Sequence, residues 1–327
     1  MTNADAAVGA VLGALVGDAA GAVLEFFRAE ITAEDVEHAL TMPGGGTWNV
    51  APGQVTDDGE LTMSLLNALA ETPDRPRQAA EHYARWAASD PFDIGVTTRN
   101  AMACLRDPAA AARARVHGVA AVMTEAAATR NQGSKANGSL MRATPLGVWG
   151  ATRSDEALIA ATQEDARLSH PNASCVEAAV VYVLAIASLV RAPGDAESAV
   201  ALGSRWASAR AGDEVRGWLA DARAGAQVPY SPQDGFVRIA FTHAFRHLVA
   251  GTPYVEALRE TLAGGGDTDT NACIVGGLVG ARWGAGAIPE AMKAAVLGCD
   301  TGRGPHPRPE ALHPRSVSAR IRALSQQ

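Results

Sequence analysis

Apolar side chains along this chain recur at the spacing of helices. Leu61, Leu65 and Leu69 stand four residues apart, which places them on one face of a predicted helix. The stretch 173–190 is apolar on nearly every side and predicts a central, buried helix. No alternating run of β-branched residues extends beyond a few positions. The pattern therefore predicts an all-α protein.

Boundary residues predict two further helices towards the C-terminal end. Thr252 followed by Pro253 is typical of a helix start, with a capping hydroxyl before a proline at the first helical position. The glycines at 264–266 are expected to end this helix. A second, apolar helix is predicted over residues 271–283.

The connections between the predicted helices are too short to separate domains, and the chain has no internal repeat. We therefore expect a single domain over residues 1–327, folded as a compact orthogonal helix bundle. From about residue 302 the chain becomes rich in proline, which predicts an extended segment on the surface.

Composition and charge narrow the class of protein. Apolar residues make up 47% of the chain but aromatic residues only 5%, so small side chains supply much of the core and allow close helix packing. The net charge is −7 and no basic tract stands out, which argues against a general nucleic-acid partner.

Cysteine usage and the N-terminal residues predict the compartment. The four cysteines form no C-x-x-C pair, which is typical of free thiols in a reducing cytoplasm and not of a disulfide frame or zinc site. The apolar run 6–17 follows Asp5 and no basic residue, the reverse of a signal peptide. The run 178–190 is too short to span a membrane. We expect a cytoplasmic monomer that does not bind membranes.

Two clusters of acidic and hydroxyl residues stand at predicted junctions between a loop and a helix. The first is TDD at residues 56–58, and the second is DTDT at residues 267–270. Glycine precedes both clusters, at Gly53 and at 264–266, and permits unusual backbone angles and the close approach of a ligand.

Helix capping alone could explain either cluster, because Asp and Thr oxygens accept the unpaired N–H groups of a helix start. Together the clusters hold four carboxylates, more than two helix starts can use. If they converge, cations or protonation must offset their repulsion. Only oxygen donors are present, which favours Mg²⁺, Mn²⁺ or Ca²⁺ over zinc or copper. Two such ions could polarise a substrate hydroxyl and orient a water.

Five segments occur in an order typical of a known family: GALVGDAAGAVLEF, TDDGELTMSL, NGSLMRATPLG, an SH pair before an apolar helix, and GGGDTDTNACIVGGLVGA. On these motifs the chain resembles the ADP-ribosylglycohydrolase family from about Gly9 to Ile288. This family includes the dinitrogenase reductase-activating glycohydrolase and hydrolases of ADP-ribosylarginine and ADP-ribosylserine. One position departs from the family, which usually reads TDDT or TDDS where this chain has Gly59. Glu60 is a candidate to compensate for the missing hydroxyl.

The resemblance implies an all-α fold that binds two Mg²⁺ or Mn²⁺ ions. The metal ligands that it implies are Thr56, Asp57, Asp58, Asp267, Asp269 and Thr270. The substrate-binding residues that it implies, along the ADP-ribose cleft and at its adenosine end, are Asn137, Gly138, Ser139, Met141, Ser169 and His170. Glu25 falls where some members carry a gating glutamate, and the implied catalytic residues are Glu25, Asp57 and Asp269.

Simpler alternatives stand beside several of these assignments. Glu25 could be a solvated glutamate at a helix end, and His170 could be an ordinary helix-start residue. Arg142 could meet a phosphate or form a structural ion pair. Trp48 could pack in the core or stack on adenine. Asp18, within GDAAG, could orient the N-terminal helices near the metals.

The implied activity is metal-dependent hydrolysis at C1″ of ADP-ribose, which releases ADP-ribose from a modified acceptor. Metal ions on the 2″ and 3″ hydroxyls would fix the ribose, and nearby carboxylates would stabilise the oxocarbenium-like transition state. ADP-ribosylarginine on protein is the expected substrate, with ADP-ribosylserine or O-acetyl-ADP-ribose as alternatives. Two other classes stay open: a catalytically silent crystallin-like protein, and a two-metal phosphohydrolase on an unrelated all-α fold.

Overall fold

Helices carry the chain from end to end in the computed structural model, which describes residues 1–27, 29–72 and 78–325. The α-helices are α1 (Asn3–Gly21), α2 (Ala33–Leu40), α3 (Asp57–Glu71), α4 (Ala79–Ala88), α5 (Val96–Met102), α6 (Pro108–His117), α7 (Val119–Arg130), α8 (Thr144–Gly150), α9 (Asp155–Arg167), α10 (Ala173–Arg191), α11 (Ala196–Arg210), α12 (Asp213–Arg223), α13 (Val237–Ala250), α14 (Tyr254–Ala263), α15 (Thr268–Trp283), α16 (Glu290–Gly298) and α17 (Val317–Ser325). Short 3₁₀ turns are η2 (Ala103–Arg106), η3 (Ala285–Ala287), η4 (Glu310–Leu312) and η5 (Pro314–Ser316). Within the described ranges, β-structure is limited to two isolated bridges, so the predicted all-α class is confirmed.

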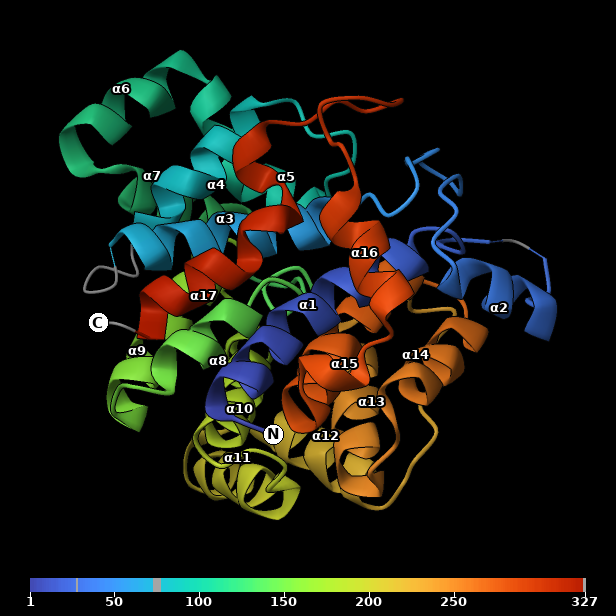
Figure 1. Cartoon of the computed structure of the whole chain (residues 1–327). Coiled ribbons are helices and arrows are strands. Elements are labelled where there is room, and N and C mark those ends of the chain that lie inside the picture. The colour runs from blue at the N-terminus through green and yellow to red at the C-terminus, as the bar shows by residue number, and fades with distance from the viewer. Residues whose placement is uncertain (28, 73–77, 326–327) are drawn as a thin grey trace.

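The centre of the molecule is an antiparallel helix pair, α1 and α15, drawn in blue and orange (Figure 1). Their backbones touch where glycines of α1, at positions 9, 13, 17 and 21, face α15. A Cβ added at Gly13 would lie 2.3 Å from the carbonyl oxygen of Gly276, and one at Gly17 would lie 2.0 Å from that of Ala272. Glycine is needed at these positions because any side chain would push the helices apart. The pairing sets the end of α1 beside the start of α15.

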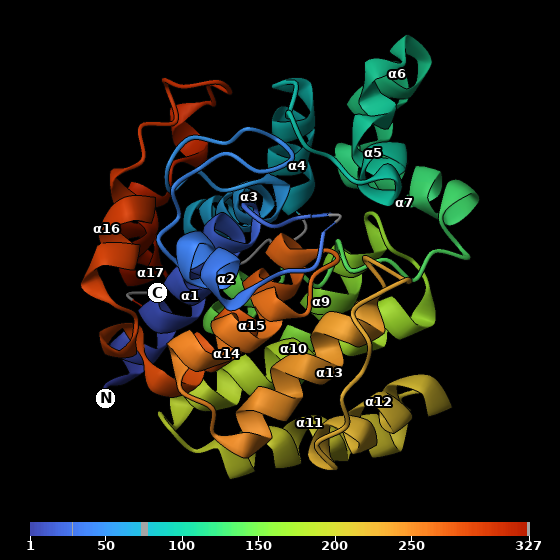
Figure 2. The same cartoon turned by 90° about the vertical axis from the view of Figure 1, so that its right-hand side faces the viewer.

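Helix α10 is the second central element, and its prediction as a buried helix is confirmed. It packs against α8, α9, α11, α13 and α15, and Figure 2 shows it enclosed among them. By length and composition, α1 and α10 could each cross a membrane. In this fold, however, 83% and 89% of their most apolar windows are buried against the rest of the chain.

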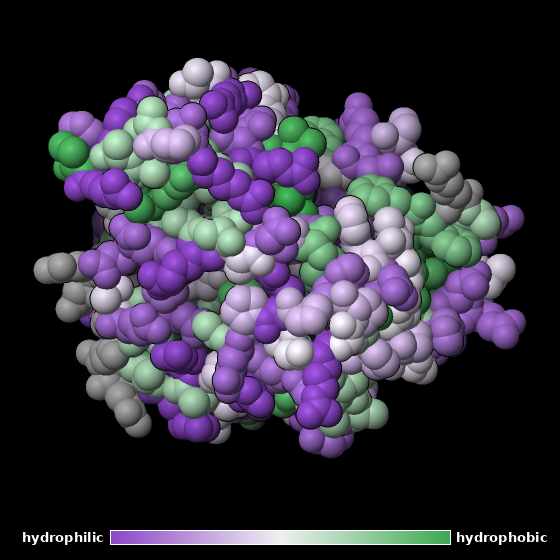
Figure 3. All heavy atoms as spheres, turned by 90° about the horizontal axis from the view of Figure 1, so that it is seen from above, coloured by the Kyte–Doolittle hydropathy of each residue, from purple (hydrophilic) through white to green (hydrophobic). Residues whose placement is uncertain are grey.

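The periphery is more polar than the centre. Helix α6 has no buried residue and stands at the upper edge in both ribbon views (Figures 1 and 2). Seen from above, the surface is mostly hydrophilic, and its apolar residues form separate small patches (Figure 3). Scattered apolar residues of this kind are normal on a protein surface.

The predicted positions of helices agree with the structure better than their predicted ends do. Leu61, Leu65 and Leu69 are fully buried on α3 as expected. Helix α15 begins at Thr268, earlier than the predicted residue 271. The prediction that Thr252 caps α14 is wrong, because its hydroxyl lies 3.1 Å from His247 Nδ1 and α14 has no side-chain cap. A tertiary contact has taken the capping group.

After α16 the chain leaves helical structure at residue 299 and crosses the surface before η4. Residues 302–305 are exposed, but the side chains of Arg308, Leu312 and His313 are buried. The segment is therefore fixed to the body of the molecule at several points. The assignment of residues 1–327 to a single domain stays a prediction.

The glycine contact between α1 and α15 predicts opposite effects at two helical glycines. Gly13→Ala should lower the free energy of unfolding by about 1–3 kcal/mol, because its Cβ would meet the Gly276 backbone. Gly217→Ala, on α12 with no atom within 4 Å of the new Cβ, should instead stabilise by about 1 kcal/mol. Urea denaturation of both variants tests the pair. Equal effects would contradict the close contact.

Candidate metal centre

The two acidic clusters, far apart in sequence, meet at one end of the α1–α15 pair. Thr56 Oγ1 lies 3.3 Å from Asp269 Oδ2, across 213 positions of sequence. Thr270 Oγ1 lies 3.2 Å from Asp58 Oδ2, across 212 positions. The start of α3 and the start of α15 therefore share one polar centre.

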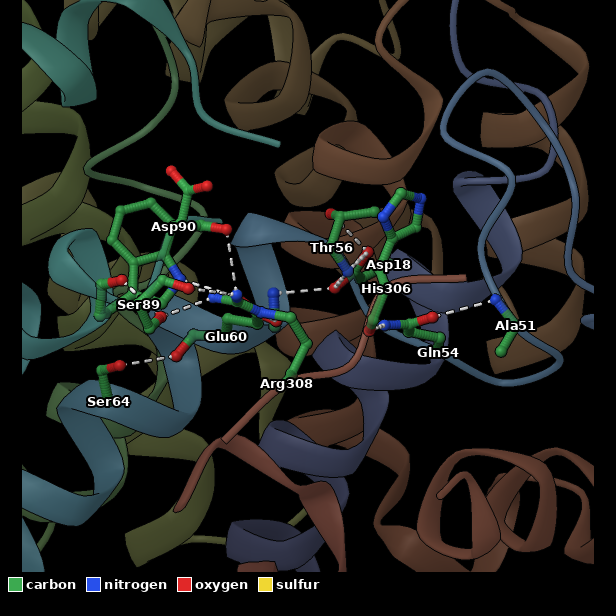
Figure 4. A network of polar contacts seen from close by, with 12 residues as sticks. Asp18, Ala51, Gln54, Thr56, Glu60, Ser64, Ser89, Asp90, His306 and Arg308 are labelled. Atoms are coloured by element: carbon green, nitrogen blue, oxygen red, sulfur yellow. Dashed lines mark hydrogen bonds and ion pairs between the residues drawn. The ribbon is translucent and has the colours of Figure 1, made fainter. Parts of the chain in front are cut away.

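The residue at the cap position of each helix supplies no side-chain cap, although Asp269 Oδ1 accepts the N–H of the next residue, Thr270, at 2.8 Å. Thr56 and Asp267 occupy the cap positions of α3 and α15, and neither makes a capping hydrogen bond. The carboxylate of Asp18, on α1, accepts hydrogen bonds from the N–H groups of Thr56 at 3.0 Å and Gly59 at 2.8 Å, and from the Thr56 hydroxyl at 2.8 Å (Figure 4). Capping of α3 is thus supplied from another helix. The capping explanation of the TDD motif is wrong, because its carboxylates do not cap α3.

Asp18 also explains the glycine at position 59. A Cβ there would lie 2.6 Å from Asp18 Oδ2 and 2.6 Å from Val55 Cβ, so a larger residue does not fit this arrangement. The hypothesis that Glu60 compensates is wrong. Its carboxylate forms a buried ion pair with Arg308, with oxygen–nitrogen distances of 2.7 and 3.0 Å.

The electrostatics of the centre are those of crowded, buried carboxylates. Burial first, and then the charge of Asp267, raise the pKa of Glu25 to about 8. Burial likewise raises the pKa of Asp57 to about 7, and the pKa values of Asp58 and Asp269 well above their usual range. Within the described part of the chain, Asp58 Oδ1 has no hydrogen-bond partner. Buried like charges of this kind need cations or protons to compensate them.

The donor set fits a divalent cation. One carboxylate oxygen from each of Glu25, Asp267 and Asp269 lies within 4.8 Å of the others. The Thr56 hydroxyl oxygen adjoins Asp269 of this group, and the Thr270 hydroxyl oxygen adjoins Asp58 beside it. Carboxylate and hydroxyl oxygens are ligands of hard cations such as Mg²⁺, Mn²⁺ or Ca²⁺. The unpartnered buried oxygen and the excess negative charge are together what such an ion would satisfy.

A cavity of about 320 Å³ opens over the carboxylates. The residues predicted as site residues that line it are Glu25, Asp57, Asn137, Gly138, Met141, His170, Asp267, Asp269 and Thr270. The predicted residues that lie behind its wall are Thr56, Asp58, Ser139 and Ser169, all of them buried. The cavity thus joins the acidic clusters to the loop at residues 137–141 and to the SH pair at residues 169–170.

A buried network supports the wall on the His170 side. His170 Nδ1 lies 2.8 Å from Ser169 Oγ, and burial lowers the pKa of His170 to about 3, so the ring is neutral. Arg142 donates to Ser169 Oγ at 2.9 Å and to the Gly138 carbonyl at 3.0 Å. It also forms a fully buried ion pair with Asp165 at 3.1 Å. The structural role of Arg142 is therefore confirmed, and its alternative role as a phosphate contact is wrong.

Glu25 is held in the opposite wall. Only 5% of it is exposed, so the solvated alternative is wrong. Trp48 Nε1 donates to Glu25 Oε2 at 2.6 Å, and the Thr47 hydroxyl donates to the Glu25 carbonyl at 2.6 Å. The next residue, Phe26, donates its N–H to the Gly266 carbonyl at 2.9 Å. Trp48 thus serves as a hydrogen-bond donor at the edge of the cavity.

Sequence analysis missed Asp93, which lies in the cavity wall on the loop after α4. Burial, and then the charges of Asp57 and Glu25, raise the pKa of Asp93 to about 10. Asp93 stands between Phe92 and Ile94, and no repeated acidic or hydroxyl pattern marks the position. Only the packing of this loop beside α3 reveals it.

Comparisons with known proteins point to one family. A sequence model of the ADP-ribosylglycohydrolase family matches residues 1–313. A protein of Acanthamoeba polyphaga mimivirus, named as an ADP-ribosyl glycohydrolase, is 30% identical over 313 residues, 89% of this chain and 90% of that protein. The ADP-ribosyl-(dinitrogen reductase) glycohydrolase of Rhodospirillum rubrum is 29% identical over 291 residues, 87% of this chain and 88% of its own.

Two further likenesses are narrower in what they support. An ADP-ribosylarginine hydrolase of Pseudomonas putida is 35% identical over 106 residues, 30% of this chain and 27% of that protein. A solved ADP-ribosylglycohydrolase-related protein complex matches with a TM-score of 0.73 and 24% identity, over 99% of this chain and 98% of its own, which supports the fold.

The family match excludes the alternative of a phosphohydrolase on an unrelated fold. The named relatives over most of the chain support a glycohydrolase and not a silent, crystallin-like protein. The order of motifs, the meeting of their carboxylates and these relatives lead to one conclusion. The chain belongs to the ADP-ribosylglycohydrolase family and is a glycohydrolase.

Proposed function

We propose that this enzyme hydrolyses the glycosidic bond between C1″ of ADP-ribose and an arginine on protein, which releases ADP-ribose and leaves the arginine unmodified. The observation that carries the proposal is the meeting of two acidic clusters under one cavity. The far wall of that cavity comes from Asn137, Gly138, Met141 and His170. A charged floor for the distal ribose thus adjoins a neutral wall for the rest of ADP-ribose.

The acidic clusters would hold two Mg²⁺ or Mn²⁺ ions through Thr56, Asp57, Asp58, Asp267, Asp269 and Thr270. When bound, such ions supply Lewis acidity to the 2″ and 3″ hydroxyls of the distal ribose and orient a water. The chain's own residues then account for binding, for charge stabilisation and for the movement of protons.

Asp57 and Asp269 line the cavity floor, where their charge stabilises the positive charge that develops at C1″. Glu25, held by Trp48 in the wall, gates entry and accepts a proton from the attacking water. At the other end, the Ser169 hydroxyl accepts from Arg142 and donates to His170 Nδ1. His170 Nε2 then carries the ring proton and donates to a substrate oxygen.

Two observations support arginine as the acceptor. Glu25 and Asp93 place two carboxyl groups in the cavity wall, and carboxyl oxygens accept hydrogen bonds from a guanidinium group. One relative, from Pseudomonas putida, is named for ADP-ribosylarginine. ADP-ribosylserine and O-acetyl-ADP-ribose carry no such cation, so the acidic wall offers them less.

Chelation should abolish turnover, and Mg²⁺ or Mn²⁺ should restore it, because uncompensated carboxylates repel one another at the reacting centre. The measurement is a panel of ADP-ribosylarginine, ADP-ribosylserine and O-acetyl-ADP-ribose, each assayed with Mg²⁺ and with EDTA. Full turnover by protein shown to be free of metal would contradict the metal centre. A preference for serine over arginine would reassign the acceptor.

Asp269→Asn and Asp58→Asn should weaken Mn²⁺ binding and lower activity. Loss of a residue that only supports a metal ligand costs roughly 10- to 100-fold, and loss of a ligand itself should cost more. Both variants should fold, because losing one charge relieves carboxylate repulsion. Isothermal titration with Mn²⁺ measures the affinity. Asp195→Asn is the control, since Asp195 caps α11 through the N–H of Ser198 at 2.9 Å. Unchanged Mn²⁺ affinity in both site variants would sink the two-cluster centre.

Glu25→Ala should lower kcat by about 100-fold, the low end for loss of a general acid or base. Although Glu25 adjoins Asp267 and Asp269, metal content should stay near that of the wild type, because all six proposed ligands remain. Glu30→Ala, an exposed glutamate a few residues further along, is the matched control and should leave kcat unchanged. Elemental analysis and steady-state kinetics give the two readouts. Loss of bound metal in Glu25→Ala would make Glu25 a ligand and not a gating residue.

A further inference from the structure

Two carboxylates of the cavity wall, Glu25 and Asp93, stand on loops and not at helix starts. The carboxylates of the TDD and DTDT motifs are placed by α3 and α15, whose packing on α1 fixes them. Glu25 and Asp93 lack that support. Some other part of the chain must therefore set the positions of their two loops.

The segment 301–309, which we call the strap, contacts the Asp93 loop directly and reaches Glu25 through Trp48. Within the strap, the backbone N–H of Arg308 donates to the Thr301 carbonyl at 2.5 Å, which closes the strap into a loop. His306 and Arg308 each lie between two prolines, in the sequence PHPRP. Proline fixes its own φ and favours extended backbone at the residue before it, so few conformations are open to these two residues.

His306 contacts the loop that carries Trp48 and the loop that carries Asp93. Its Nε2 donates to the Trp48 carbonyl at 2.5 Å, and its own carbonyl accepts from Gln54 Nε2 at 2.9 Å (Figure 4). Its ring stacks on Phe92, with centroids 4.4 Å apart and planes inclined by 21°. One residue thus joins loops that are separate in sequence.

Each contact leads directly to a site carboxylate. Trp48, whose carbonyl accepts from His306, donates its indole N–H to Glu25 at 2.6 Å. Phe92, on which His306 stacks, immediately precedes Asp93. The same loop continues to Gly95, whose N–H hydrogen-bonds the Asp57 carboxylate. Displacement of His306 would remove one support from each of the loops that carry Trp48 and Asp93.

Arg308 anchors the strap to the helices. Its guanidinium pairs with both oxygens of Glu60 on α3, at 2.7 and 3.0 Å, and donates to the Ser89 carbonyl at 2.9 Å. Trp86 Nε1 also donates to the Glu60 carboxylate, at 2.7 Å. Figure 4 shows Arg308 and His306 on the same segment, with Arg308 directed at Glu60 and Ser89. The strap is therefore fixed where α3 begins, next to the TDD motif.

We propose that the strap is a positioning element of the active site and that His306 is the positioning residue that sets Glu25 and Asp93 in the cavity wall. The inference rests on the proposed function for the reaction that these carboxylates serve. The part of the inference that concerns how firmly the loops are held does not depend on the proposed function, because loop mobility can be measured without substrate.

The first test is His306→Ala, which removes both the hydrogen bond and the stacked ring. We expect kcat to fall by about 10- to 100-fold, the range found when a group that orients a reacting residue is lost. We expect KM and the melting temperature to change little. Arg303→Ala, on the exposed part of the same strap, is the matched control and should leave kcat unchanged. Arg308→Ala is unsuitable because it leaves Glu60 buried and unpaired.

Hydrogen exchange gives the readout that needs no substrate. In His306→Ala the amides of residues 44–54 and 91–95 should exchange faster, while those of α10 should exchange as in the wild type. Faster exchange in α10 as well would indicate a general loss of stability and would overturn the proposal. Unchanged exchange in both loops would overturn it too. Neither result depends on whether the wild type hydrolyses ADP-ribosylarginine.

A double-mutant cycle tests the path to Glu25. His306→Phe keeps the stacked ring but loses the donor, and Trp48→Phe loses the indole N–H that holds Glu25. If His306 acts through Trp48, the double variant should have nearly the kcat of Trp48→Phe alone. Multiplicative losses in kcat would overturn that path. An inactive wild type would count against the proposed function and leave the hydrogen-exchange test of the strap to decide.

Discussion

The contact between the backbones of α1 and α15 is the constraint on which the site depends. A Cβ at Gly21 would lie 2.4 Å from the Cα of Asp269. The row of α1 glycines that faces α15 therefore extends to the acidic clusters. Because the helices run antiparallel, the same contact carries Asp18 to the start of α3, where it accepts the N–H groups of Thr56 and Gly59. One helix thus fixes the starts of two others. A separation larger by one methyl group would move both acidic clusters.

Supply of the α3 cap from α1 has an electrostatic consequence. At an ordinary helix start the acidic residue is consumed by the N–H groups of its own first turn. Here Asp18 takes that role, so the carboxylates of Asp57 and Asp58 are not used to cap α3. The helix N-termini of α3 and α15 both face the centre, and their partial positive charge favours the carboxylates there. That contribution is small beside the repulsion among buried charges, so the fold alone does not neutralise the site.

Sequence patterns predict those parts of the molecule that local chemistry decides. The spacing of Leu61, Leu65 and Leu69 identifies α3, and continuous apolarity identifies α10. The paired TDD and DTDT motifs identify the acidic centre. Asp93 and His306 could not be found in this way, because each matters through contacts between irregular segments that lie far apart in sequence. Helix-capping residues are hard to predict for the same reason, because a side chain such as that of Thr252 can bond to a tertiary partner instead of to its own helix.

The site therefore has two kinds of support, and they respond to different changes. Groups at the starts of α3 and α15 depend on helix packing, which is close-packed and resists small displacements. Glu25 and Asp93 depend on loops that are held by a few hydrogen bonds and one stacked ring. Local opening costs less in such segments than in the core. The loops are therefore the part of the cavity wall that opens most readily. The carboxylates at the starts of α3 and α15 have the rigid support, and Glu25 and Asp93 have the adjustable one.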